Sequence, residues 1–206
     1  MVTPYGTTEE GIETQFGTNH IGPFLFTNLL LQAGLIKERI VNVNSSASVR
    51  KAAYALAPLD DITYDHGKSY SPAQGYTTSK MANLLYTRQL AAKLKDQKIS
   101  AFSLNPGSVR SPLQRHMDDD IRKAAYAVAY KESYNFEPPK LKTLQQGCST
   151  QLRAALDPSL VAASGAYLDD CQVVEYREHV EAYPAADRIW KISEELVGER
   201  FDVLHP

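Results

Sequence analysis

Cysteine, net charge and long hydrophobic runs are all scarce in this 206-residue chain. Two cysteines cannot build a framework of several disulfides, so a reducing compartment and a cytoplasmic location are expected. A net charge of −2 gives no electrostatic reason to expect nucleic acid or an anionic membrane as a partner. The most apolar stretch, residues 21–36, is interrupted by polar residues and is too short to span a membrane. The first residues also lack the basic and apolar regions of a secretory signal.

Closely spaced glycines and clustered metal ligands are absent as well. No two of the 11 glycines stand closer than five positions, so neither Gly-x-Gly nor Gly-x-x-x-Gly-x-Gly can be written anywhere in the chain. A dinucleotide-binding fold uses such glycines where its first strand turns into a helix, because backbone amides must approach the pyrophosphate there. The five histidines are scattered without metal-ligand spacing, so no metal site is expected.

Hydrophobic periodicity predicts helices that alternate with short strands. Helices are expected over residues 9–35, 72–95, 121–130, 141–156 and 187–196, and strands over residues 39–44, 99–104 and 165–169. Thr7 and Gly34 suit the two ends of the first helix, and Pro23 is expected to kink or divide it. The alternation indicates βαβ units with a parallel sheet, in one domain that covers residues 1–206.

Three groups of complementary chemistry are expected at one edge of this sheet. Ser45 follows the first strand, while Tyr76 and Lys80 stand four residues apart on a helix and can face one ligand. A free tyrosine has a pKa of about 10, and a nearby ammonium is expected to lower that pKa. Hydroxyl, phenol and ammonium together can hold a substrate oxygen while a proton moves.

The same Tyr-x-x-x-Lys spacing occurs a second time, at Tyr64 and Lys68. That segment carries several aspartates and Gly67, so no helix is expected to bring the two side chains to one face. We therefore interpret the second pair as a chance match. A serine hydrolase is a more distant alternative, because the chain contains no Gly-x-Ser-x-Gly turn.

Several ordered motifs carry a resemblance to a known family. They are GIETQFGTNHIGPFLFTNLLL (11–31), RIVNVNSSAS (39–48), GYTTSKMANLLYTRQLA (75–91), LNPGSVRSPL (104–113), KTLQQGCST (142–150) and SGAYLDDC (164–171). Over nearly its whole length the chain resembles the short-chain dehydrogenase/reductases, in the branch of retinol dehydrogenase-like and WW-domain oxidoreductase-like proteins. The resemblance implies an α/β fold: the C-terminal half of a partial Rossmann-type, doubly wound parallel sheet with about three strands.

The resemblance also implies a catalytic tetrad of Asn19, Ser45, Tyr76 and Lys80. Tyr76 would be the general acid or base, and Ser45 would orient the substrate carbonyl or alcohol. Lys80 would bind the nicotinamide ribose and lower the pKa of the tyrosine, while Asn19 would anchor a water of the proton relay. NADP or NAD would be the cofactor, held by Tyr76 and Lys80 and bordered at the nicotinamide by Pro106, Gly107, Val109 and Ser111. The implied activity is interconversion of a small carbonyl and an alcohol by hydride transfer.

The chain departs from the family pattern at two positions. The family usually has two serines where Asn44 and Ser45 stand, so Ser46 is an alternative to Ser45. It usually has threonine where Ser111 stands, which keeps the hydroxyl. Residues 112–139 lack a strong core pattern and are expected to form a lid over the substrate.

The glycine-rich half of the family fold is expected to be missing from these 206 residues. By the resemblance, the chain begins after the fourth strand of the family sheet, and residues 39–44 would then have an unpaired edge. Weak NAD(P) binding and little or no activity are expected as a result. The alternative is a non-catalytic family remnant that acts as a binding or dimerisation module. A homodimer would form through the helices around Asn19 and Tyr76.

Overall fold

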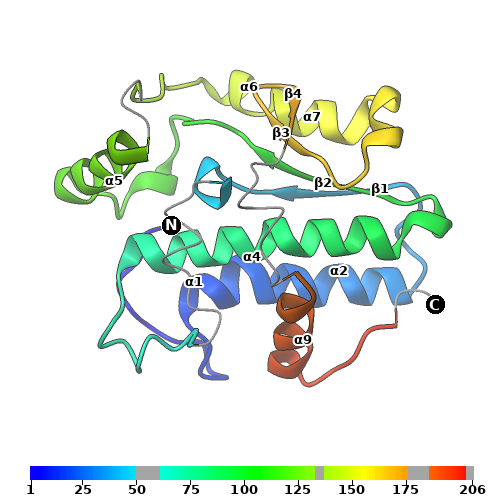
Figure 1. Ribbon diagram of the computed structural model, residues 1–206, viewed down its shortest axis with the longest axis horizontal. Helices are drawn as coiled ribbons and strands as arrows, with labels where there is room; N and C mark the ends of the chain where they lie inside the picture. The colour runs from blue at the N-terminus through cyan, green and yellow to red at the C-terminus, as the bar shows by residue number, and fades with distance from the viewer. Residues whose placement is uncertain (50–60, 133–136, 176–185, 203–206) are drawn as a thin grey trace.

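A four-stranded sheet with helices on both faces forms the centre of the molecule (Figure 1). The computed structural model describes residues 1–49, 61–132, 137–175 and 186–202. The strands lie in the order β1 (Arg39–Val43), β2 (Ser100–Asn105), β3 (Tyr167–Asp169) and β4 (Gln172–Val174). The first three are parallel, and β4 pairs with β3 antiparallel. The predicted α/β class and its three strands are confirmed, whereas the exposed strand β4 was not predicted.

The strand β1 lies at one edge of this sheet. It pairs with β2 from Arg39 opposite Ser100 to Val43 opposite Leu104. Among the described residues, no strand pairs with its other side. Val43 at its carboxyl end is 47% exposed.

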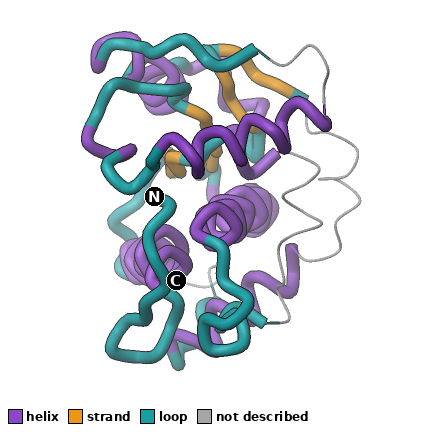
Figure 2. Tube along the Cα trace, turned by 90° about the vertical axis from the view of Figure 1, so that its left-hand side faces the viewer, coloured by secondary structure: helices purple, strands orange, loops and turns teal. Residues whose placement is uncertain are grey.

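Twelve helices and helical turns are described. They are α1 (Thr14–Phe16), η1 (Gly17–Ile21), α2 (Gly22–Gln32), η2 (Ser46–Val49), α4 (Pro72–Lys93), η3 (Lys95–Gln97), η4 (Pro112–Gln114), α5 (Asp119–Glu132), α6 (Leu144–Gly147), α7 (Ser149–Leu156), η5 (Pro158–Ala163) and α9 (Ala186–Val197). In Figure 1, α2, α4 and α9 cover one face of the sheet and α7 covers the other. Figure 2 shows the same layers from the side, with two helices seen nearly end-on below the strands. In the part of the chain that the structure describes, no helix is both long and apolar enough to cross a membrane.

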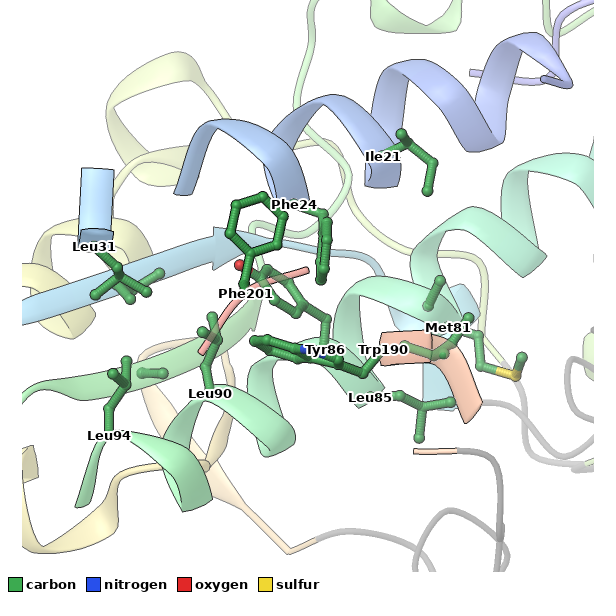
Figure 3. Packing of buried hydrophobic residues seen from close by; sticks show 14 of the residues in the cluster. Ile21, Phe24, Leu31, Met81, Leu85, Tyr86, Leu90, Leu94, Trp190 and Phe201 are labelled. Carbon is green, nitrogen blue, oxygen red and sulfur yellow. The ribbon is translucent and has the colours of Figure 1, made fainter. Parts of the chain in front are cut away.

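Two apolar clusters hold these layers together. The larger one joins α2, α4 and α9, and Phe24 lies at its centre with ring centres 5.1 Å from Tyr86, 5.2 Å from Trp190 and 5.7 Å from Phe201 (Figure 3). The smaller one lies on the opposite face of the sheet, between β2, β3 and α7. Because both faces are covered, β2 is buried along almost its whole length.

The first predicted helix is divided differently from the expectation. It begins at Thr14 because the carboxylate of Glu13, and not Thr7, accepts from the backbone N–H of Gln15 and Phe16 at 2.9 and 2.8 Å. A π-helical turn, η1, then separates α1 from α2, and Pro23 stands in the first turn of α2. Gly34, with a φ of +63°, follows the end of the helix as predicted.

The predicted helix over residues 141–156 is also shorter and divided. It begins at Leu144, because Thr143 and Gln146 form a capping box with bonds of 3.2 and 2.9 Å. It breaks at Cys148 into α6 and α7. The helices predicted over residues 121–130 and 187–196 are confirmed with slightly longer bounds, as α5 and α9.

Candidate active site

The predicted site residues gather at the carboxyl ends of β1 and β2. Ser45 follows β1, and Tyr76 and Lys80 lie in the first half of α4. The Ser45 hydroxyl lies near enough to the Tyr76 phenol to lower its pKa, and Lys80 Nζ lies 5.9 Å from the centre of the Tyr76 ring. The hydroxyl, the phenol and the ammonium therefore lie together at the carboxyl end of β1, as expected from the sequence.

Burial controls the proton affinity of both ionisable groups in this site. Burial raises the pKa of Tyr76, and the nearby Ser45 hydroxyl opposes that rise. Lys80 Nζ donates to the Val43 carbonyl at 3.1 Å, and the lowering of the Tyr76 pKa by Lys80 stays a prediction. Burial lowers the pKa of Lys80 itself to about 8. At neutral pH the phenol therefore carries its proton.

Asn44 fixes the position of Ser45. Its buried side chain accepts from the Ser45 backbone N–H at 2.9 Å and donates to Ser103 Oγ at 2.9 Å on the neighbouring strand. Asn44 stands where the family usually has a serine, and its side-chain amide links the end of β1 to β2. Of the two serines Ser45 and Ser46, Ser45 is the one that affects the pKa of Tyr76. From the sequence, Asn44 could be recognised only as a departure from the family pattern. Its role could not be predicted, because its partner Ser103 is 59 residues away.

Asn19 lies in the π-helical turn η1 and faces α4. Its amide Nδ2 donates to Ser79 Oγ at 3.0 Å, and Ser79 Oγ donates to the Tyr76 carbonyl at 2.8 Å. Pro23, four residues further on, has no N–H to donate to the Asn19 carbonyl, and Asn83 Nδ2 donates to that carbonyl at 2.8 Å. Asn19 is thereby held beside the turn of helix that carries Tyr76. π-turns of this kind recur at functional sites.

Asn105, the last residue of β2, orders the loop that follows this strand through two side-chain hydrogen bonds. Asn105 Oδ1 accepts from the Gly107 N–H at 3.1 Å, and Asn105 Nδ2 donates to Asp169 Oδ1 at 3.1 Å. Gly107 has a φ of +80°, and a Cβ placed on it would lie 2.9 Å from Lys142 Cε. The loop therefore needs glycine at this position for both its conformation and its close approach to Lys142.

The segment before α6 supports the same loop from outside. The Lys142 N–H donates to the Ser108 carbonyl at 2.7 Å, and Lys142 Nζ pairs with Asp170 at 2.8 Å. Val109 packs so closely on Gly147 that a Cβ there would lie 2.5 Å from Val109 Cγ2. Ser111 Oγ accepts from the Leu113 N–H at 3.4 Å and caps the turn η4. A hollow of about 350 Å³ beside this loop is lined by Arg110, Leu141, Lys142, Thr143 and Leu144.

The second tyrosine–lysine pair does not form a site. The phenol of Tyr64 is buried and donates to Thr78 Oγ1 at 3.0 Å. Lys68 is exposed and pairs with Asp65 at 3.3 Å. Tyr64 has a φ of +55° in a turn, so the helical spacing that would align the pair does not exist. Among the described residues, no group of His, Cys, Asp or Glu side chains could hold a metal ion.

The chain is similar in sequence to dehydrogenases over nearly its whole length. It is 34% identical to human retinol dehydrogenase 12 over 204 residues, 98% of this chain and 60% of the relative. Mouse retinol dehydrogenase 14 is 37% identical over 95% of this chain and 55% of the relative. The chloroplastic short-chain dehydrogenase TIC 32 B of Brassica napus is 34% identical over 96% of this chain and 61% of the relative. The chain thus spans about three fifths of the length of these relatives, and no family model matches it.

Solved structures have the same fold. An uncharacterised protein from Mycobacterium paratuberculosis superposes with a TM-score of 0.62 and 26% identity, over 98% of this chain and 65% of that one. A 4-hydroxyisoleucine dehydrogenase complexed with NADH gives a TM-score of 0.50 with 18% identity, over 75% of this chain and 55% of that one. The second likeness concerns the fold alone. The chain therefore shares its fold with part of each of these two longer proteins.

Proposed function

Because the chain belongs to the short-chain dehydrogenase/reductase family, we propose that its site interconverts a carbonyl and an alcohol by hydride transfer with a nicotinamide dinucleotide. The observation that carries the proposal is that Ser45, which follows β1, and Tyr76 and Lys80 on α4 come together, with Lys80 Nζ 5.9 Å from the centre of the Tyr76 ring. A hydroxyl and a phenol placed in this way can both reach one substrate oxygen. Nothing else in the described site is as well suited to move a proton to that oxygen.

In the direction of reduction, each residue has a separate task. Ser45 donates a hydrogen bond to the carbonyl oxygen and orients it. Tyr76 gives its proton to the same oxygen as the alcohol forms, and Lys80 stabilises the phenolate that remains. Since burial raises the pKa of Tyr76, the phenol is protonated at neutral pH and is ready to act as the acid. Asn19 is proposed to hold the water that returns a proton to Tyr76.

The residues present fit the nicotinamide side of such a cofactor. An ammonium has three donors, and one Lys80 donor is used by the Val43 carbonyl, so donors remain for two ribose hydroxyls. The loop from Pro106 to Ser111, which turns at Gly107 with a φ of +80°, would lie along the nicotinamide. A bound nicotinamide supplies or accepts the hydride at the substrate carbon. The dinucleotide is proposed to be NADP or NAD.

Cofactor binding by these 206 residues is proposed to be weak. The chain contains no closely spaced glycines to cradle a pyrophosphate, so the adenosine and pyrophosphate would add little affinity. We therefore expect a millimolar requirement for the cofactor and low turnover. For the substrate, the relatives named as retinol dehydrogenases make a lipophilic aldehyde such as retinal the first compound to test.

The test is reduction of retinal, or of a small aromatic aldehyde, at millimolar NADPH or NADH, followed by the loss of nicotinamide absorbance. Tyr76→Phe removes the acid and is expected to lower kcat by about 10²-fold or more. Tyr64→Phe is the matched control, because it removes the phenol of the other Tyr-x-x-x-Lys pair and is expected to keep the wild-type kcat. Equal rates for wild type and Tyr76→Phe would refute the assignment.

A second candidate function is dimerisation without catalysis. The helix α2 exposes Phe26 by 65% and Leu29 by 43%, and these side chains would be covered if α2 packed against a second copy of the chain. Sedimentation of the wild type and of Phe26→Asp tests this candidate. A dimer that Phe26→Asp dissociates, together with no turnover at any cofactor concentration, would favour it over the enzyme.

A further inference from the structure

A chain of buried polar groups runs from α9 to the proposed active site. Ser193 Oγ lies 2.7 Å from His20 Nε2, and His20 Nδ1 lies 3.1 Å from Asn83 Oδ1. Asn83 Nδ2 donates to the Asn19 carbonyl at 2.8 Å. His20, Asn83 and Ser193 are all buried, and none of them was singled out by the sequence. A buried polar group without a hydrogen-bond partner lowers the stability of the fold, so each of these three side chains is expected to be paired.

The hydrogen bond to the Asn19 carbonyl fixes the hydrogen atoms of Asn83 and of His20 Nδ1. The Asn83 amide must present its nitrogen to the Asn19 carbonyl, since the reverse orientation would bring two oxygens to 2.8 Å. Its oxygen then faces His20 Nδ1, which must carry a proton. A neutral imidazole has one proton, so Nε2 is an acceptor. The Ser193 hydroxyl lies 2.7 Å from Nε2 and 2.7 Å from the Ile189 carbonyl, and it shares its one proton between these two acceptors. Burial lowers the pKa of His20 to about 4, so the ring holds no second proton at neutral pH.

From His20 onwards the direction of donation is the same at every step. His20 donates to Asn83, Asn83 to the Asn19 carbonyl, and Asn19 Nδ2 to Ser79 at 3.0 Å. The last link, from Ser79 Oγ to the Tyr76 carbonyl at 2.8 Å, ends on the residue that would transfer the proton. The aromatic rings of Phe16, Phe24 and Tyr86 pack around His20 at 5.1 to 6.1 Å and fix the ring.

We propose that Asn83 is a positioning residue of the active site, and that His20 and Ser193 hold it in the orientation that fixes Asn19. The proposal rests on the proposed function in one respect: the proposed function has Asn19 hold a water of the proton relay. Asn83 touches no reacting atom; it supplies the hydrogen bond that Pro23 cannot give to the Asn19 carbonyl. A carbonyl oxygen has two lone pairs, so this bond still leaves Asn19 able to hold a water.

The kinetic test compares Asn83→Ala with Asn28→Ala. Asn28 is also a buried asparagine that donates to a helix carbonyl, that of Phe24 at 2.9 Å, yet it does not touch the site. Asn83→Ala is expected to lower kcat by about 10- to 100-fold with little change in KM, because a small misplacement of a proton relay is costly. Asn28→Ala is expected to keep kcat within about twofold. Equal losses in the two variants would overturn the proposal.

A nuclear magnetic resonance measurement tests the proposal without any turnover. In wild-type protein with ¹⁵N-labelled histidine, His20 is expected to carry its proton on Nδ1 at neutral pH. Asn83→Ala is expected to shift the side-chain amide signal of Asn19, and Asn28→Ala is expected to leave it in place. A proton on Nε2, or an unmoved Asn19 signal in Asn83→Ala, would overturn the proposal. If these signals behave as expected but no carbonyl is reduced, the proposed function fails and the positioning role stands.

Discussion

Replacing Lys80 by methionine is expected to stabilise the folded chain at neutral pH while it removes the proposed site. The Lys80 ammonium is half-buried, and burial lowers its pKa to about 8. Methionine keeps a flexible apolar stem of similar length and brings no charge. Burial of the Lys80 ammonium lowers the free energy of unfolding of the wild type, and the replacement removes this cost.

The magnitude follows from the pKa. The folded pKa of about 8 against the ordinary value of 10.5 corresponds to about 3.4 kcal/mol, at about 1.36 kcal/mol for each pH unit. Partial exposure of the side chain and the lost hydrogen bond to the Val43 carbonyl reduce the net gain to about 1–2 kcal/mol. Below pH 8 both the folded and the unfolded state carry the proton, so the cost is complete. Between pH 8 and 10.5 the unfolded state binds the proton and the folded state does not, so wild-type stability rises with pH.

Urea unfolding measures this effect, followed by circular dichroism at pH 7 and at pH 10. Lys80→Met is expected to gain about 1–2 kcal/mol at pH 7, and the gain should shrink at pH 10. Lys95→Met is the control, because Lys95 is exposed and its replacement is expected to change stability by no more than about 0.5 kcal/mol. A Lys80→Met chain that is less stable than wild type at pH 7 would refute the reasoning.

Three further predictions concern the packing and the loop. Phe24→Ala is expected to cost about 3–5 kcal/mol in urea unfolding, whereas Phe26→Ala, 65% exposed on the same helix, should cost no more than about 0.5 kcal/mol; similar losses would contradict the packing in Figure 3. Gly107→Ala is expected to cost about 1–2 kcal/mol in the same assay, because φ is +80° and Lys142 must shift, and a neutral result would contradict this. His20 has a folded pKa of about 4, so up to about 3 kcal/mol of stability should be lost as pH falls from 6.5 to 4; the loss should disappear in His20→Leu.

The sequence predicts the parts of the site that depend on local spacing. The four-residue spacing of Tyr76 and Lys80 needs only a helix, and α4 covers both residues. Ser45 follows a short β-branched run, so its place at the end of β1 follows from the position of that strand. The three parallel strands also have clear patterns, whereas β4 is only three residues long and exposed along its whole length, so its two valines give too short a signal.

The remaining features depend on contacts between distant parts of the chain. The π-turn η1 lies inside the helix that was predicted from apolar spacing over residues 9–35. That spacing does not distinguish a π-helical turn from an α-helical one. Asn83 reaches Asn19 across 64 residues, and Ser193 reaches His20 across 173. The direction of the pKa change of Tyr76 needs the burial of the ring, which spacing does not give. These are the features on which the proposed proton relay depends.

The π-turn η1 also determines which changes of chain length this protein tolerates. Phe16 and Phe24 are eight residues apart, so a plain α-helix would place them roughly 80° apart around its axis. The wider turn brings both onto the buried face, where each ring packs on His20. Loss of a single residue between 17 and 21 would leave Phe16 and Phe24 seven residues apart, and a plain α-helix places such residues only about 20° apart. A one-residue deletion is therefore expected to keep the packing of α1 and α2 while it removes the wide turn that holds Asn19 beside Ser79.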